Sequence, residues 1–291
     1  MRRVIASAVL VGAVAACPAR AEPDGFARAF VSAVWAEDSA LLDDEDFDSS
    51  ALIAGLSGGW EYSKSKTRLQ LSSTVVDYTD GGRDDRWNNE LRLGQELELS
   101  DDVDFDGQLV LATEVQTLEF RNADQATLQG RLTWRPSAAD RLRLYAAYRT
   151  RSYDDAAATN ADAPYFGVEW RRRVDRGAYF ELEARHEEVD ADRASFDYRR
   201  TSLTASYSRT FDDKTRGRAV LGYRTWTYDN RLTPAGRSRE DWSLAPELEL
   251  RRALTAAVDL ELNVRHVIRR SNDDRFERDG NRVAVSLAYE F

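Results

Sequence analysis

Hydrophobic and polar residues alternate along the chain from about residue 52 to the C-terminus. Leucine occupies positions 91, 93, 97 and 99, and Arg92, Glu96 and Glu98 lie between them. The segments 142–148, 180–184 and 244–250 repeat this arrangement. A period of two is typical of a β-strand with one apolar and one polar face. The pattern therefore predicts a long series of two-faced strands.

The connections between these strands are alternately short and long. The short ones cover residues 63–66, 100–102, 136–140, 172–176, 212–215 and 252–255. The long ones cover 78–85, 121–124, 152–163, 189–196, 229–239 and 270–280. Short turns at one end and longer loops at the other are typical of an outer-membrane β-barrel, whose short turns face the periplasm. We expect an all-β, up-and-down antiparallel transmembrane barrel.

The strand count tests this expectation. Thirteen strands are evident between Leu52 and Phe291, and an even-stranded barrel requires one more before them. Residues 26–35 can supply it, which gives about 14 strands, although 12 or 16 strands, or a periplasmic helix over this segment, remain alternatives. Pro246 falls inside a strand and lacks the backbone donor of a ladder hydrogen bond, so it predicts a β-bulge.

Aromatic residues fall near both ends of the predicted strands, as expected of the two aromatic girdles of a membrane barrel. A soluble β-sandwich is the rival fold, but it does not require a single meander with two aromatic belts. We place the periplasmic girdle at Trp60, Tyr62, Phe105, Trp134, Phe211, Tyr289 and Phe291, and the outer girdle at Tyr78, Trp87, Tyr148, Phe166 and Trp242.

The N-terminus has the features of a secretory signal peptide, which explains how a polar chain would reach a membrane. The whole chain has a mean hydropathy of −0.58 and 32% of its residues are charged, so composition alone would suggest a soluble protein. Residues 1–21 contain a basic start, an apolar stretch and an Ala-Arg-Ala cleavage site. Residues 22–291 would form one barrel domain. Cys17 leaves open a lipoprotein signal instead.

The C-terminal sequence NRVAVSLAYEF resembles the signal that the barrel-assembly machinery of Gram-negative bacteria recognises. The residues that carry this resemblance are Val285, Leu287, Tyr289 and Phe291. The mature chain as a whole resembles the putative beta-barrel porin 2 families in its pattern of strands and acidic outer loops, which implies porin-like transport. The barrel of surface lipoprotein assembly modifiers ends similarly, but those proteins carry a helical-repeat domain that is not evident here.

The face of the strands opposite the leucines combines small residues at mid-strand with many charges. Such small residues, including Ser72, Gly94, Gly167 and Gly222, cannot fill a barrel of this width, so we expect a polar lumen. The residues predicted to line the pore are Arg68, Arg92, Glu96, Glu98, Asp104, Asp106, Glu114, Arg131, Arg135, Arg141, Arg143, Arg149, Glu169, Glu181, Glu183, Arg185, Arg216, Arg218, Arg224, Glu247, Glu249, Asp259, Glu261, Arg265 and Arg282.

These charges alternate in sign between sectors of the wall, so neighbouring strands can form ion pairs. They either hold the wall rigid or create a field that orients dipolar solutes. Both interpretations predict no strong selectivity for one sign of charge. The acidic run 43–48 lacks the glycine and distal glutamate of a calcium loop. We interpret it as a solvated rim, which divalent cations could bridge to lipopolysaccharide.

No catalytic or cofactor motif stands out. The only histidines, His186 and His266, are predicted to point outward near the external rim, and neither fits a triad spacing. The net charge of −10 argues against nucleic-acid binding. We therefore expect a channel, without cofactor or metal, for passive diffusion of small hydrophilic solutes across the outer membrane of a Gram-negative bacterium. A structural or polysaccharide-export barrel is the alternative, and an enzyme acting on envelope lipid is a third hypothesis.

Overall fold

The computed structural model describes residues 24–37, 50–62, 65–79, 85–116, 122–153 and 160–291. They form fourteen β-strands and two short 3-10 helices. The strands are β1 (Asp24–Ala36), β2 (Ala51–Tyr62), β3 (Thr67–Tyr78), β4 (Arg86–Ser100), β5 (Val103–Gln116), β6 (Asn122–Trp134), β7 (Asp140–Ser152), β8 (Ala161–Arg173), β9 (Ala178–Ala191), β10 (Tyr198–Thr210), β11 (Thr215–Leu232), β12 (Ser238–Ala253), β13 (Val258–Ser271) and β14 (Arg278–Glu290). The helices are η1 (Ala194–Phe196) and η2 (Asp274–Phe276).

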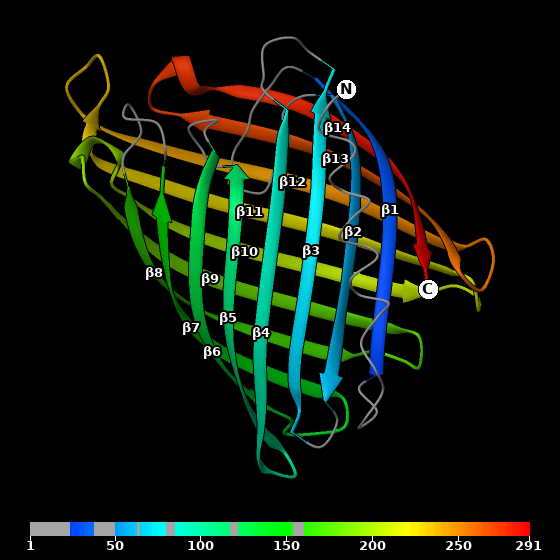
Figure 1. The fold of residues 1–291 in the computed structure, drawn as a ribbon. Coiled ribbons are helices and arrows are strands. Elements are labelled where there is room, and N and C mark those ends of the chain that lie inside the picture. The colour runs from blue at the N-terminus through cyan, green and yellow to red at the C-terminus, as the bar shows by residue number, and fades with distance from the viewer. Residues whose placement is uncertain (1–23, 38–49, 63–64, 80–84, 117–121, 154–159) are drawn as a thin grey trace.

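Every strand pairs antiparallel with its sequence neighbours, and β1 also pairs with β14, which closes the ring. Figure 1 shows the result as one tilted ring, with the blue β1 beside the red β14. The predicted up-and-down barrel of about 14 strands is therefore confirmed. A strand, not a helix, occupies the segment 26–35. No helix in the described part of the chain is long and apolar enough to cross a membrane.

The alternation in the sequence gives the wall an inner and an outer face. The leucines point outward and are widely exposed, as Leu203, Leu248 and Leu128 illustrate at 50%, 63% and 64%. The opposite face is concave, so side chains two strands apart can meet there, as Arg28 of β1 and Glu261 of β13 do at 2.7 Å. Contacts that skip a strand therefore identify the inner face.

The short turns lie at one end of the barrel, which we call the short-turn end. Four of them use the same device, in which an oxygen of a Ser, Thr or Asp side chain accepts a backbone N–H two residues later. These residues are Ser137, Asp175, Asp212 and Thr255. Hydrogen bonding to the Lys214 amide holds the pKa of the Asp212 carboxyl below its ordinary 3.8. The sequence of each turn thus fixes where its strand ends.

The opposite end, which we call the long-loop end, differs from the prediction in detail. The sequence pattern predicts loops over 189–196, 229–239 and 270–280, whereas the structure leaves only residues 192–197, 233–237 and 272–277 between strands. β11 and β12 are longer as a result, with 18 and 16 residues. The predicted loop 121–124 likewise lies largely within β6. In these segments the apolar alternation ends at polar residues, and for this reason the sequence predicts loops there. The same polar residues still pair through their backbones, so the strands extend beyond the apolar band.

Pro246 does not produce the predicted bulge. Its pairing with Leu221 of β11 continues the register, and the register between β12 and β13 is the same on both sides of it. Only the pairings with β13 next to the proline are interrupted, because its missing N–H faces that strand. A register shift instead separates Ala112 from Val115 of β5, where Glu114 adopts a φ of 52°.

One residue of the predicted aromatic girdles is misplaced. Tyr78 faces inward and packs against a cluster of Val34, Ile53 and Val76 on the inner face of β1 to β3. The remaining strand residues of the two girdles lie on the outer face, where Trp134 and Phe166 are 47% and 61% exposed. The predicted signal peptide 1–21 with Cys17, and the acidic run 43–48, lie outside the described residues.

Candidate functional site: the inner face of the barrel

The strand registers show where the predicted pore residues lie. Apart from Arg135 and Glu114, all occupy alternate positions that pair across strands on the inner face. Arg135 belongs to the turn after β6, and Glu114 lies at the bulge in β5. The Glu114 carboxylate accepts a hydrogen bond of 2.5 Å from the Trp87 amide, so it supports the irregular end of the β4–β5 pair.

Ion pairs run around the inner face in the half nearer the short turns. Arg141 Nη2 lies 2.9 Å from Glu169 Oε1, and Arg143 Nη1 lies 3.1 Å from the same oxygen. The other pairs are Arg68–Glu96 at 3.1 Å, Arg135–Asp104 at 2.5 Å, Arg171–Glu181 at 2.7 Å, Arg218–Glu249 at 3.3 Å, Arg251–Asp259 at 2.5 Å and Arg28–Glu261 at 2.7 Å. Most are partly exposed, so each contributes only about 0.2–1 kcal/mol.

At mid-wall, Tyr145 of β7 reaches across β8 and donates a hydrogen bond of 2.5 Å to Glu183 of β9. Its ring passes over Gly167, which pairs directly with it. The absence of a side chain at Gly167 makes this crossing possible, because a Cβ there would lie 2.4 Å from the Tyr145 ring. The Arg185 guanidinium stacks on the neighbouring Tyr165, 4.0 Å from the ring centroid.

The inner face in the other half, nearer the long-loop end, contains a fully buried carboxylate. Glu187 of β9 is 0% exposed and accepts hydrogen bonds from Arg149 of β7, Arg185 of β9 and Arg200 of β10. Arg200 Nε lies 3.0 Å from Glu187 Oε2. A lone buried carboxylate would be strongly destabilising, and three guanidiniums compensate for its lost hydration.

A second buried carboxylate lies on the same part of the wall. Asp241 of β12 accepts from Arg239 on its own strand, from Arg269 of β13 and from Ser271. Beside it, Trp226 is 1% exposed and belongs to an apolar cluster with Tyr198 and Tyr228. This side of the ring is therefore thickly packed with arginines and aromatic rings.

Sequence reasoning missed the members of these two clusters that lie near the strand ends. They are Glu187, Arg200, Arg239, Asp241 and Arg269. The signal was present, because the period-two pattern continues through 198–202 and 239–243. Arg239 belongs to the segment 229–239, which the pattern predicts to be a loop, and the other four residues lie within four positions of a predicted loop.

We use the term basic wall for a set of inner-face arginines in β7 and in β9 to β14. Each of them lies between the midpoint of its strand and the long-loop end, at a position that pairs with a neighbouring strand. It consists of Arg149, Arg151, Arg185, Arg200, Arg224, Arg239, Arg265, Arg269, Arg278 and Arg282. Across the ring, β1 to β3 present the apolar cluster around Val34, Ile53 and Val76 at this end. The two sides of the interior therefore differ in chemistry.

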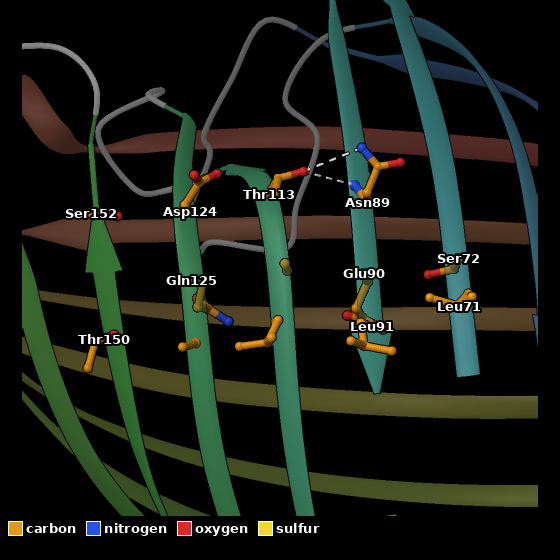
Figure 2. A pocket seen from close by; sticks show the side chains of 13 residues that line it. Leu71, Ser72, Asn89, Glu90, Leu91, Thr113, Asp124, Gln125, Thr150 and Ser152 are labelled. Atoms are coloured by element: carbon orange, nitrogen blue, oxygen red, sulfur yellow. Dashed lines mark hydrogen bonds between the residues drawn. The ribbon is translucent and has the colours of Figure 1, made fainter. Parts of the chain in front are cut away.

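A pocket of about 450 Å³ lies on the outer face of β3 to β7, not inside the barrel. Figure 2 shows Asn89, Thr113 and Asp124 at one level, with Leu71 and Leu91 below them. Asn89 Nδ2 lies 3.4 Å from Thr113 Oγ1. The pocket therefore marks the level at which the outer surface changes from apolar to polar.

The two histidines lie in the half of the barrel nearer the long loops. Both occupy outward positions, as predicted. His186 Nδ1 lies 3.0 Å from Thr201 Oγ1, and His266 Nδ1 lies 2.8 Å from Asn281 Oδ1. Their hydrogen bonds join neighbouring strands on the outer surface.

Solved structures with the same architecture are outer-membrane proteins. OmpT of Vibrio cholerae matches with a TM-score of 0.58 at 9% identity, covering 94% of this chain and 99% of that one. The outer membrane channel DcaP of Acinetobacter baumannii matches at 0.55 with 11% identity, over 93% and 97%. A bacterial polysaccharide outer membrane secretin matches at 0.56 with 10% identity, over 91% and 98%.

These likenesses establish the fold, which is that of an outer-membrane β-barrel. No family model matches the chain, and no curated protein matches it. The resemblance to the putative beta-barrel porin 2 families therefore stays a hypothesis.

Proposed function

We propose that this protein is a porin-like channel of the outer membrane that allows small hydrophilic solutes to diffuse passively. The observation that carries this proposal is the segregation of charge and leucine between the two faces of a closed ring. Glu249 turns inward and pairs with Arg218, whereas its neighbours Leu248 and Leu250 turn outward and are 63% and 42% exposed. An apolar exterior suits lipid, and a charged interior suits water.

In the proposed channel, solutes would pass the middle of the wall, where the inward side chains are small. Ser72, Gly94, Ser202 and Gly222 lie on the inner face near the midpoints of their strands, between the ion pairs of one half and the basic wall of the other. Barrels of eight strands are filled by side chains and those of 16 to 18 strands leave a channel. Fourteen strands with small residues at mid-wall favour a narrow channel whose width the longer charged side chains set.

The outer surface supports a location in the outer membrane, with lipid and lipopolysaccharide as neighbours. Leu287 and Tyr289, which carry the resemblance to the assembly signal, are 45% exposed on the outer face of β14. Tyr289 packs edge-on against Phe291 with 4.7 Å between ring centroids. A component of the barrel-assembly machinery could reach these side chains directly. Solutes, lipopolysaccharide and this machinery are the partners we propose.

Conductance across a planar lipid bilayer tests the channel. Protein purified from outer membranes, with folding verified by its heat-dependent shift in gel mobility, should give discrete openings with a linear current–voltage relation in 1 M KCl. Folded protein that inserts but produces no openings would contradict the proposal. The test requires no knowledge of the natural solute.

A barrel that belongs to a polysaccharide-export system is the second candidate. The likeness to a polysaccharide outer membrane secretin favours it, although that likeness concerns the fold. Such a barrel would remain closed by itself and conduct only with its partner proteins. The absence of enzymatic activity remains a prediction, and replacing His186 and His266 in a lipid-hydrolysis assay would test it.

A further inference from the structure

Arginines and serines alternate along one row of the inner face. Arg185 of β9 pairs with Ser202, and Ser202 pairs with Arg224 of β11. Arg224 pairs with Ser243, which in turn pairs with Arg269 of β13. Because adjacent strands lie about 4.8 Å apart, an arginine recurs about every 9.6 Å along the wall. The small serines between them leave the guanidiniums room on the inner surface.

The row belongs to a half of the interior with a large excess of positive charge. The midpoints of the strands divide the described inner-face residues into two halves. The half nearer the long loops contains twelve arginines (Arg86, Arg92, Arg149, Arg151, Arg185, Arg200, Arg224, Arg239, Arg265, Arg269, Arg278 and Arg282) and three carboxylates (Glu90, Glu187 and Asp241), with Glu114 at the bulge of β5 as a fourth. The half nearer the short turns contains ten arginines and thirteen carboxylates.

The carboxylates in the basic half are already shared between several arginines. Three guanidiniums converge on Glu187, and two converge on Asp241 together with a hydroxyl. Buried donor atoms also exceed acceptors in this region, because Arg185 Nε, Arg239 Nη1 and Trp226 Nε1 have no acceptor among the described residues. The region therefore offers N–H donors and positive charge, which are the complement of an oxyanion.

We propose that the basic wall binds anions and gives the channel a preference for small anionic solutes that carry carboxylate or phosphate groups. This inference rests on the proposed channel function and adds the class of solute. Guanidinium groups recognise both oxyanions through paired N–H donors. A concave wall of one charge sign concentrates counter-ions, so anions would enter this half of the interior preferentially. This proposed anion preference takes the place of the expectation, drawn from the sequence, of no strong selectivity for one sign of charge.

The reversal potential in a KCl gradient tests the preference. With 1 M KCl on one side of the bilayer and 0.1 M on the other, the wild-type channel should favour chloride over potassium severalfold. The triple variant R185Q/R224Q/R269Q should reduce this permeability ratio at least threefold. If the triple variant does not fold, R224Q alone should shift the ratio in the same direction.

A matched control separates the inner wall from general surface charge. Arg199 occupies the outer face of β10 at the same end of the barrel and pairs with Asp229 at 2.8 Å. The variant R199Q removes an equal charge outside the interior and should leave the permeability ratio unchanged. An equal shift with R199Q and R224Q would overturn the proposal.

A second readout uses anions directly. Citrate and inorganic phosphate, added at millimolar concentration, should reduce the chloride current of the wild type and affect the triple variant less. If the wild type conducts but favours potassium, this inference fails while the channel proposal stands. If folded wild type does not conduct at all, the channel proposal itself fails.

Discussion

The Tyr145 hydroxyl lies 2.5 Å from the Glu183 carboxylate, although the whole of strand β8 separates their strands. The contact is possible because the wall is concave on this side and because Gly167 lets the ring pass close to the backbone. A polar side chain at mid-wall thereby joins three strands. The interior is braced by such contacts in addition to the backbone ladder.

The variant G167A should therefore destabilise the barrel. Its Cβ would lie 2.4 Å from the Tyr145 ring and 2.7 Å from the Ala184 carbonyl oxygen. Overpacking of this kind costs about 1–3 kcal/mol of unfolding free energy, measurable by urea unfolding followed through tryptophan fluorescence. The control G222A meets nothing nearer than 3.8 Å and should change stability little. Adding Y145A should recover part of the loss, and no recovery would show that the ring is not the obstacle.

The neighbours Glu187 and Glu188 should respond very differently to the same substitution. E187Q leaves three guanidiniums without their buried anion and should cost about 3–5 kcal/mol of unfolding free energy. E188Q alters an outward side chain that is 64% exposed and should stay within about 0.5 kcal/mol of wild type. Equal effects in urea unfolding would mean that Glu187 is not buried as the structure shows.

An introduced charge should destabilise the barrel more on the outer face than at the adjacent position on the inner face. Leu203 and Thr204 are adjacent near the middle of β10, with Leu203 outward and 50% exposed and Thr204 inward. L203R should cost about 2–4 kcal/mol of unfolding free energy in lipid vesicles, as expected for arginine near the centre of a bilayer. T204R should cost clearly less than L203R. The reverse order would argue against a lipid-facing exterior.

Acid should loosen the loop that contains η2. The Arg275 side chain hydrogen-bonds Asp273 and holds the pKa of the Asp273 carboxyl below its ordinary 3.8. The folded loop therefore favours the ionised form, so this stabilisation is present above pH 3.8 and is lost as pH falls through the lower folded value. Hydrogen exchange of residues 272–277, corrected for intrinsic rates, should accelerate as the pH falls below 3.8.

Two variants check the origin of that acid response. D273N should remove the pH dependence and expose the amides at neutral pH as well. D274N leaves the Asp273–Arg275 pair in place and should behave as wild type. If D274N removes the response instead, the neighbouring carboxyl is responsible.

The sequence by itself determined most of the strands and their two faces. These depend on the period-two pattern, which each segment carries locally, and on short turns whose Ser, Thr or Asp side chains close them, as Asp212 does. The inward or outward position of most charged residues followed directly, because successive residues of a strand alternate between faces.

Only the tertiary structure decided which of these side chains meet. Glu187 receives arginines from β7, β9 and β10, and the Tyr145–Glu183 bond skips a strand, so both depend on register and curvature that no single segment contains. Tyr78 is different, because the local alternation of β3 already places it on the same face as Ser72, and this alternation outweighs the general placement of aromatic rings at interfaces. The basic wall, by contrast, arises from arginines that are far apart in the chain and adjacent once the ring closes.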